Sequence, residues 1–244
     1  SKFTRYIWIH DNYFHDGNME FIYTVDNTPL SDIYIYNNIF QGGTSTNVGI
    51  FLAWDTTSVY LYNNIFYQIG AAGTEMIGVA GRDGTNSFFK NNIFYSRPGQ
   101  TFVAIGASGP TNFTSDYDLY YDPDGTTTLP SGSGITVTNA RTGDPLFVNP
   151  SAGDFTLQSS SPAIDAGTSS VSAIVSVDYN GNPRPMGTGY DIGAYEYNGP
   201  AVPMLQFSSG TYSVSEGAAT ATINVTRIGS ASGAVSVNYA TSNG

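Results

Sequence analysis

Hydrophobic and polar residues alternate with a period of two in four short segments of the first half of the chain. The segments recur at similar intervals and cover residues 6–10, 32–36, 58–62 and 86–90. Alternation of this period places every second side chain on the same face, which is typical of a strand with one buried face. The pattern therefore predicts four strands, each with a mainly apolar inward row and an outward row rich in aromatic residues.

A three-residue motif follows each segment and recurs once more farther along the chain. Its copies are Asn12-Tyr13-Phe14, Asn38-Ile39-Phe40, Asn64-Ile65-Phe66, Asn92-Ile93-Phe94 and Asp118-Leu119-Tyr120. The first residues of these copies are 26, 26, 28 and 26 positions apart. Further strands are expected at residues 21–25, 49–53, 76–80 and 102–105. A repeat of ~26 residues with short strands, Gly and Asn turns and no room for a helix predicts one coil of a parallel β-solenoid.

The asparagine that opens the motif is expected to hold neighbouring coils together. Stacking brings equivalent residues into line, and the ladder so formed contains Asn12, Asn38, Asn64 and Asn92. Their amides can hydrogen-bond from one coil to the next, which satisfies polar groups that are otherwise buried without partners. We interpret these asparagines as structural rather than catalytic.

With these motifs, residues 1–125 resemble the right-handed parallel β-helix proteins of the pectate-lyase-like class, whose coils often carry an Asn-Asn-Ile-Phe turn. The resemblance implies a fold and says little about an activity. The expected fold is all-β, namely a right-handed parallel β-helix with a C-terminal cap and a partial β-sandwich.

Motifs of a different kind follow residue 142. They include Gly143-Asp144-Pro145, Ser161-Pro162-Ala163, Asn182-Pro183-Arg184 and Asp191-Ile192-Gly193. This series resembles the C-terminal tail of secreted bacterial β-helix proteins of the choice-of-anchor kind. Because the end of a solenoid exposes strand edges and an apolar cross-section, we expect the tail to cover it. Arg184 stands between Asp178 and Asp191, so we expect it to form an internal ion pair.

The last part of the chain predicts a linker rich in Pro and Gly, followed by alternating strands. The strands resemble the first part of a Calx-β domain, a β-sandwich that often binds Ca²⁺, and the resemblance makes Glu216 a calcium ligand. We expect a piece of a longer polypeptide with additional domains. The expected divisions are residues 1–142 for the coils, 143–197 for the cap, 198–204 for the linker and 205–244 for the incomplete sandwich.

Composition and charge narrow the possible partners. The 244 residues include 8 Lys+Arg and 19 Asp+Glu, a net charge of -11, which argues against nucleic acid because phosphate binding needs a basic surface. The absence of cysteine excludes disulfides and thiolate metal sites, and no apolar run reaches the ~18 residues of a membrane span. Ser1 leads directly into the first strand without a signal peptide, so we expect a mature secreted or cell-surface protein or a fragment of one.

The outward positions of the repeated strand provide the first candidate site. Their aromatic members are Trp8, Tyr34, Tyr36, Tyr60, Tyr62 and Phe88. In register on stacked coils, these rings would lie about 4.8 Å apart and form an aromatic strip. Such a strip could bind the sugar rings of an extracellular polysaccharide or cell-surface glycan, or the C-terminal segment could cover it, in which case it would serve packing alone.

Acidic and basic residues provide further candidates. Asp55 and Asp83 are in the same phase on adjacent coils, and Asp26 ends the equivalent strand one coil earlier. These carboxylates could bind Ca²⁺, act as the paired carboxylates of a glycosidase or cap solvated turns. Polysaccharide lyases of the resembled fold use a Lys or Arg base together with Ca²⁺, a role that the resemblance gives to Lys90 or Arg82.

Two classes of function remain open. One is a non-catalytic rod that binds extracellular glycans or displays other domains toward them. The other is a carbohydrate-active enzyme, either a Ca²⁺-assisted lyase or a hydrolase that uses carboxylates. The sequence favours the first class, because the basic residues that a lyase needs are scarce and the β-helix fold supports many functions.

Overall fold

A computed structural model of the chain describes most of its residues. The described ranges are residues 6–17, 20–24, 32–43, 49–53, 58–80, 86–105, 112–199, 204–215, 217–218, 220–228 and 236–240. The chain forms two compact units, residues 1–197 and residues 198–244.

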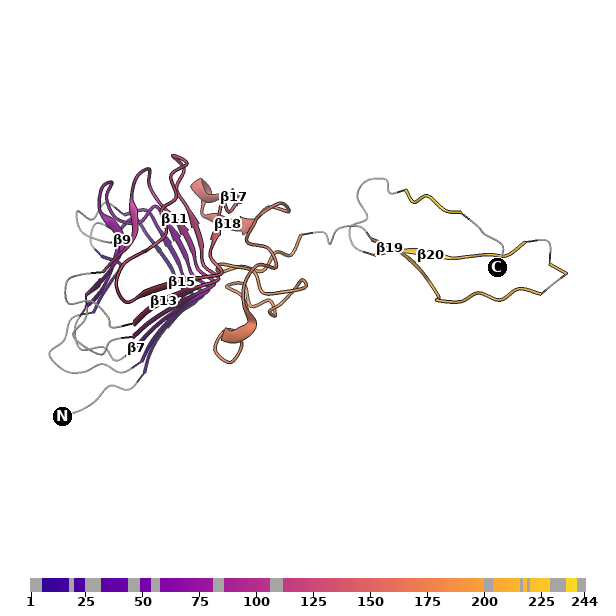
Figure 1. The fold of residues 1–244 in the computed structure, drawn as a ribbon, viewed down its shortest axis with the longest axis horizontal. Coiled ribbons are helices and arrows are strands. Elements are labelled where there is room, and N and C mark those ends of the chain that lie inside the picture. Colours follow the sequence, from indigo (N-terminus) through magenta and orange to yellow (C-terminus); the bar gives the residue numbers. More distant parts are fainter. Residues whose placement is uncertain are drawn as a thin grey trace. The chain divides into compact units, whose positions relative to one another are not determined.

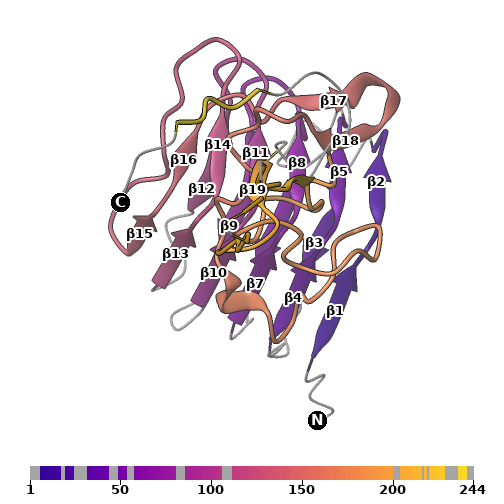
Figure 2. The ribbon, with the colours of Figure 1, turned by 90° about the vertical axis from the view of Figure 1, so that its right-hand side faces the viewer.

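The first unit is an all-β parallel β-solenoid of about four turns (Figure 1), as predicted. Three parallel sheets run along it (Figure 2). The first contains β1 (Ile7–His10), β4 (Ile33–Tyr36), β7 (Ser58–Tyr62), β10 (Asn86–Lys90), β13 (Asn112–Asp116) and β15 (Ile135–Thr138). The second contains β2 (Tyr13–His15), β5 (Ile39–Gln41), β8 (Ile65–Tyr67), β11 (Ile93–Tyr95), β14 (Leu119–Tyr121) and β16 (Arg141–Thr142). The third contains β3 (Ile22–Thr24), β6 (Ile50–Ala53), β9 (Glu75–Ala80) and β12 (Thr101–Ile105).

The turn between the first and second sheets explains the doubled asparagine of the central coils. The residue before the ladder asparagine has a positive φ, which is 51° at Asn37, 53° at Asn63 and 58° at Asn91. Asparagine adopts this left-handed conformation more readily than most residues do. The chain bends there, and the two residues that follow the ladder asparagine begin a strand of the second sheet.

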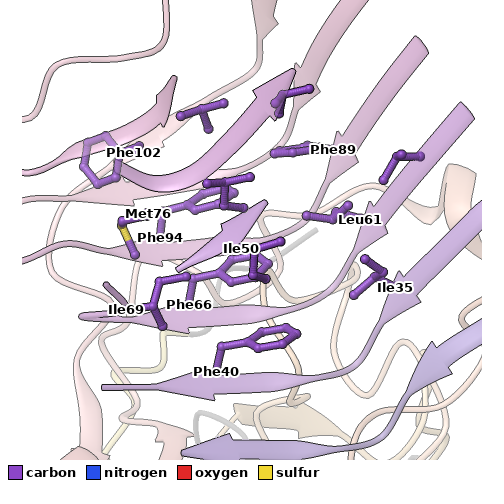
Figure 3. Close-up of a cluster of buried hydrophobic side chains, with 14 of the residues drawn as sticks. Ile35, Phe40, Ile50, Leu61, Phe66, Ile69, Met76, Phe89, Phe94 and Phe102 are labelled. Atoms are coloured by element: carbon purple, nitrogen blue, oxygen red, sulfur yellow. The ribbon is translucent and has the colours of Figure 1, made fainter. Parts of the chain in front are cut away.

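Aromatic rings fill the interior of the coils (Figure 3). The rings come from the third residue of each motif copy and include Phe40, Phe66, Phe94 and Tyr120. Successive ring centroids lie 5.1, 5.0 and 4.9 Å apart, and all four side chains are fully buried. Because burial of one such side chain stabilises a fold by roughly 1.5–3 kcal/mol, this stack is a large part of the driving force for adding each coil.

The predicted asparagine ladder is confirmed. The Oδ1 of Asn38 accepts hydrogen bonds from the backbone N and the Nδ2 of Asn12, both at 3.1 Å, and the Nδ2 of Asn38 donates to the carbonyl of Ile9 at 2.8 Å. Asn64 and Asn92 repeat this pattern on the next two coils. These buried side chains thus satisfy a backbone amide and their own polar atoms at each turn.

A carboxyl group ends the ladder. The Oδ1 of Asp118 accepts from the backbone N and the Nδ2 of Asn92 at 2.7 and 2.9 Å, and its Oδ2 accepts from the Ser115 hydroxyl at 2.7 Å. Complete burial raises the pKa of Asp118 to about 7, although the hydrogen bonds from Ser115 and Asn92 lower it. The charge of this terminal group therefore changes near neutral pH.

Residues 143–197, the tail, pack along the side of the solenoid (Figure 2). Their elements are β17 (Phe147–Asn149), β18 (Asp154–Leu157) and the short 3-10 helices η1 (Pro150–Ala152) and η2 (Ser169–Val171). The tail buries the outward residues that open the second-sheet strands, which are Ile39, Ile65, Ile93 and Leu119. The sequence pattern predicted a cover over the end of the stack. The contacts instead place the tail across successive coils, because the second sheet presents an apolar outer row that also requires burial.

The left-handed asparagines form a second, outer row that binds the tail. Its members, which we call the outer asparagine row, are Asn37, Asn63 and Asn91. The Nδ2 of Asn63 donates to the carbonyls of Asp191 and Gly193 at 3.2 and 3.1 Å. Asn91 donates to the carbonyl of Thr168 at 2.9 Å and accepts from its backbone N at 2.8 Å. Each doubled asparagine therefore joins the coils through one side chain and holds the tail through the other.

A buried ion pair fixes the tail internally. Arg184 Nη1 donates to Glu196 Oε1 at 2.8 Å, with both side chains fully buried, and Arg184 Nη2 donates to the carbonyl of Gly193 at 2.9 Å. The internal ion pair predicted for Arg184 is confirmed, but its partner is Glu196. Asp178 and Asp191, the partners that the sequence indicated, are buried and accept hydrogen bonds from backbone amides.

The second unit contains one antiparallel pair of strands among its described residues, β19 (Met204–Phe207) and β20 (Val225–Ile228). No side chain whose burial is described in this unit is buried, and the exposed ones include Phe207, Val214 and Ile223. Glu216, the expected calcium ligand, lies outside the described residues.

Replacing a central member of the ladder should weaken the solenoid. Asn64→Leu is expected to lower the free energy of unfolding by about 1–3 kcal/mol, because it leaves buried amide groups of the neighbouring coils without partners. Asn12→Leu is the matched control, since Asn12 is exposed and has a neighbour on one side only. Denaturant titration measures both, and equal losses at the two positions would contradict the buried-ladder explanation.

Asp118 should make stability fall as pH rises from about 4 to about 7. In this range the unfolded chain has already lost the proton, since a free Asp has a pKa of about 3.9, whereas the folded chain still holds it. The free energy of unfolding therefore decreases with pH by a few kcal/mol on this group's account. Asp118→Asn is expected to flatten the slope in denaturation measured between pH 4 and pH 8.

Part of that slope should survive in the Asp118→Asn variant. Burial also raises the pKa of Asp191 to about 6, which acts with the same sign over a lower pH range. The new amide can keep the bond from Asn92 and can donate to the carbonyl of Phe89, as Asn92 does to Leu61 one coil earlier. A slope identical to that of the unsubstituted protein would show that Asp118 is ionised throughout.

The outer asparagine row can be tested without straining the turn. Asn63→Gly keeps a residue that tolerates positive φ and removes both bonds to the tail, so it should cost about 1–3 kcal/mol and speed hydrogen exchange in residues 191–193. Gln68→Gly is the control, because Gln68 has a φ of 51° and no side-chain hydrogen bond among the described residues. Faster exchange in both variants would mean that the backbone change alone loosens the tail.

Candidate functional site

An aromatic ladder runs across the outer face of the first sheet. Its rings stand four residues before the ladder asparagines and belong to Trp8, Tyr34, Tyr60 and Phe88. Strand register places them side by side, with centroids 4.5, 4.5 and 5.2 Å apart and ring planes within 14° of parallel. These four stacked rings form one column of the expected aromatic strip.

Stacking determines which parts of these rings a ligand can reach. The faces of Tyr34 and Tyr60 meet neighbouring rings on both sides, so only their edges and hydroxyls face outward. Trp8 lies on β1, the first strand of the sheet, and its outer face has no further described strand against it. Trp8 is 46% exposed, whereas Tyr34, Tyr60 and Phe88 are half-buried. Among the described residues, the ladder thus offers one open ring face, that of Trp8, and a row of edges along its length.

The Tyr34 hydroxyl of this ladder stays protonated over the physiological pH range. Burial raises the pKa of Tyr34, and the neighbouring Tyr60 hydroxyl and Asp32 raise it further. A neutral hydroxyl can both donate and accept a hydrogen bond. Tyr34 therefore presents a neutral donor and acceptor next to apolar ring edges.

A second outward column lies two residues closer to the asparagine ladder, and the tail covers its middle. His10 stacks on Tyr36 with centroids 4.7 Å apart. Tyr36 and Tyr62 pack against a tail cluster formed by Val171, Val175 and Tyr190. Burial raises the pKa of Tyr62 well above its usual value. The column of Tyr36 and Tyr62 therefore packs against the tail, as the packing interpretation expects. The aromatic ladder is not part of that contact and stays open to a ligand.

Lys90 belongs to the covered column. Its Nζ donates to the hydroxyl of Ser170 in η2 at 3.1 Å, so the tail engages the group that a lyase would need as a base. Phe88 lies two residues away on the same face of β10, at the end of the aromatic ladder. The structure thus brings Lys90 near the predicted aromatic residues and gives it a tail partner.

The remaining candidates for acid, base or metal chemistry lie outside the described residues. They are Arg82, Asp26, Asp55, Asp83 and Glu216. In the part of the chain that the structure describes, no group of three or more His, Asp or Glu side chains could hold a metal ion. No helix in the described ranges is long and apolar enough to cross a membrane.

Sequence reasoning missed the outer asparagine row, which decides what the tail covers. Its signal was visible as the doubled asparagine at Asn37, Asn63 and Asn91, which occurs on the three central coils only. The equivalent positions of the flanking coils hold Asp11 and Tyr117, which also have positive φ. All five residues have a positive φ, which asparagine adopts more readily than most residues do. The three asparagines also hydrogen-bond to the tail, which is a further reason for asparagine at these positions.

Comparison with models of protein families, with curated proteins and with solved structures gave no match for this chain.

Proposed function

We propose that the protein is a secreted or cell-surface β-solenoid that binds an extracellular glycan without cleaving it. The observation that carries the proposal is the aromatic ladder, which stays open to solvent although the tail covers the neighbouring column. An open row of large aromatic side chains on a polar surface is a common mark of a binding site. The regular spacing of the rings suits an extended, repeating ligand.

The chemistry of the ladder favours a neutral glycan. A sugar ring can stack on the open face of Trp8, and the units that follow can hydrogen-bond to the hydroxyls of Tyr34 and Tyr60. The net charge of -11 opposes a polyanionic chain. Since the described residues form no group able to hold a metal, the proposal does not rely on Ca²⁺ to offset that repulsion.

The contacts of Lys90 support binding over catalysis. An elimination needs a base free to take a proton beside a uronate carboxylate, and the Lys90 Nζ donates to the Ser170 hydroxyl of the tail in an exposed hydrogen bond. The enzymatic alternative therefore has no supporting contact among the described residues.

We include in this proposal the resemblances to specific families that the sequence suggested. Kinship with the pectate-lyase-like class, a choice-of-anchor type of tail and a Calx-β sandwich with Glu216 as a calcium ligand would all suit a bacterial surface protein. In that setting the solenoid is a rigid spacer within a longer polypeptide, and the aromatic ladder is its contact with the glycan.

Removing the exposed indole should weaken glycan binding. Trp8→Ala is expected to lower the affinity for a neutral polysaccharide about tenfold, because stacking on one aromatic face is worth about 1–3 kcal/mol. Affinity electrophoresis in gels containing xylan, glucomannan, pectate or alginate measures the effect. Tyr239→Ala is the control, since Tyr239 is 91% exposed and lies in the second unit.

Two results would overturn the proposal. The first is either no binding to any of these glycans by the unsubstituted protein, or binding whose affinity is unchanged in Trp8→Ala. The second is a rise in ultraviolet absorbance on incubation with pectate or alginate that disappears in Lys90→Ala, which would establish an eliminating lyase.

A further inference from the structure

A pocket of about 500 Å³ lies beside the free edge of the third sheet. The order of that sheet ends at β12, and the next coil contributes strands to the first and second sheets and then a loop after β14. The pocket lies between residues 99–103 and residues 122–131. It is therefore built on a different sheet from the aromatic ladder and occupies the place where a further strand is missing.

Carboxylates and hydroxyls dominate the polar lining of this pocket. The groups are those of Thr101, Asp122, Asp124, Thr126, Thr128 and Ser131. Apolar parts of the wall come from Phe102, which is buried in the core, and from Leu129, which packs against the core. Among the described residues, no Lys or Arg lines the pocket. Its volume falls within the roughly 300–1,000 Å³ typical of small-molecule sites.

Backbone hydrogen bonds hold the two carboxylates in place. Asp122 is almost fully buried, and its Oδ2 and Oδ1 accept from the backbone N of Gly99 and of Asp124 at 2.9 and 3.1 Å. Asp124 Oδ1 accepts from Thr126 N at 2.9 Å, whereas its Oδ2 has no hydrogen-bond partner among the described residues. The pocket therefore presents a fixed, exposed carboxylate oxygen that is available to a ligand.

We infer that this pocket binds a neutral sugar residue. A carboxylate with a free oxygen accepts strongly from a sugar hydroxyl, and the surrounding Thr and Ser hydroxyls can both donate and accept. The apolar wall suits the C–H face of the ring. Absence of a basic lining residue disfavours uronates and phosphorylated ligands, because their charge would face Asp122 and Asp124 without compensation.

An added peptide strand fits the pocket less well than a sugar does. A strand needs the whole length of the β12 edge for its backbone hydrogen bonds. Leu129, Pro130 and Ser131 line the pocket together with Thr101–Val103, so the loop shares the space beside the first half of that edge. The remaining space has the size and the hydroxyl-rich lining of a compact polar ligand.

Titration calorimetry with neutral tetrasaccharides tests this inference. The probes are the β-1,4-linked tetramers of glucose, xylose and mannose, with the galacturonate tetramer as the charged comparison. Asp124→Asn should lower the affinity for the neutral probe that binds best about tenfold, because it removes a charge-assisted hydrogen bond. Asp144→Asn is the matched control, since Asp144 is exposed, accepts from a backbone amide two residues on, as Asp124 does, and lies outside the pocket. Amide shifts of Gly99, Thr101 and Thr126 in NMR spectra should locate the bound sugar.

The possible results separate this pocket from the aromatic ladder. Binding that survives Trp8→Ala but weakens in Asp124→Asn, with shifts at Gly99 and Thr101, supports the pocket whatever the fate of the ladder. Binding that vanishes in Trp8→Ala and is unchanged in Asp124→Asn overturns the pocket and leaves the proposed function intact. The inference also fails if no neutral probe binds, if the galacturonate tetramer binds better, or if Asp144→Asn weakens binding as much as Asp124→Asn.

Discussion

Hydrogen bonding between buried asparagines of successive coils is the interaction on which the rest of this structure depends. Each ladder side chain satisfies a backbone amide of the coil before it and a carbonyl as well, so the coils can stack in one register only. That register sets the spacing of the side chains on the outer faces of the sheets. It brings the rings of Tyr34 and Tyr60 to 4.5 Å, aligns the apolar row that the tail buries and places the outer asparagine row in a line.

The same register limits what the outer face can recognise. When the rings of a column stack on one another, most ring faces contact other rings of the protein. Along its length the column therefore offers a ligand ring edges and hydroxyls, and few open ring faces. The end of the column differs, because Trp8 keeps one face free. With the proposed glycan as ligand, specificity would come from the end residue and from the hydroxyl pattern, and affinity would grow with the length of glycan that lies along the ladder.

The coils could be predicted from the sequence, but the way in which the tail packs on them could not. The position of each residue within the repeat was enough to predict the strands and the asparagine ladder, because stacked coils of similar length place equivalent residues in line. Phase could not show that Arg184 pairs with Glu196 rather than with Asp178, since that choice depends on how the tail folds over the coils. For the same reason, the division of the aromatic strip into a covered and an open column could not be predicted. The pocket beside β12 lies where the chain after β14 forms a loop and adds no further strand to the third sheet, a feature that the repeat did not predict.

The tail contacts also order the events of folding. Asparagine ladder contacts join residues 26 or 28 apart, so a coil can add to the stack soon after its own residues are synthesised. The hydrogen bonds of the outer asparagine row to the tail join residues 77 to 147 positions apart, which costs more loop entropy and must wait for the tail. In the interval, Ile39, Ile65 and Ile93 form an uncovered apolar stripe on an otherwise formed solenoid. An exposed apolar stripe of this kind favours aggregation. The tail removes this risk when it packs on the stripe and buries it.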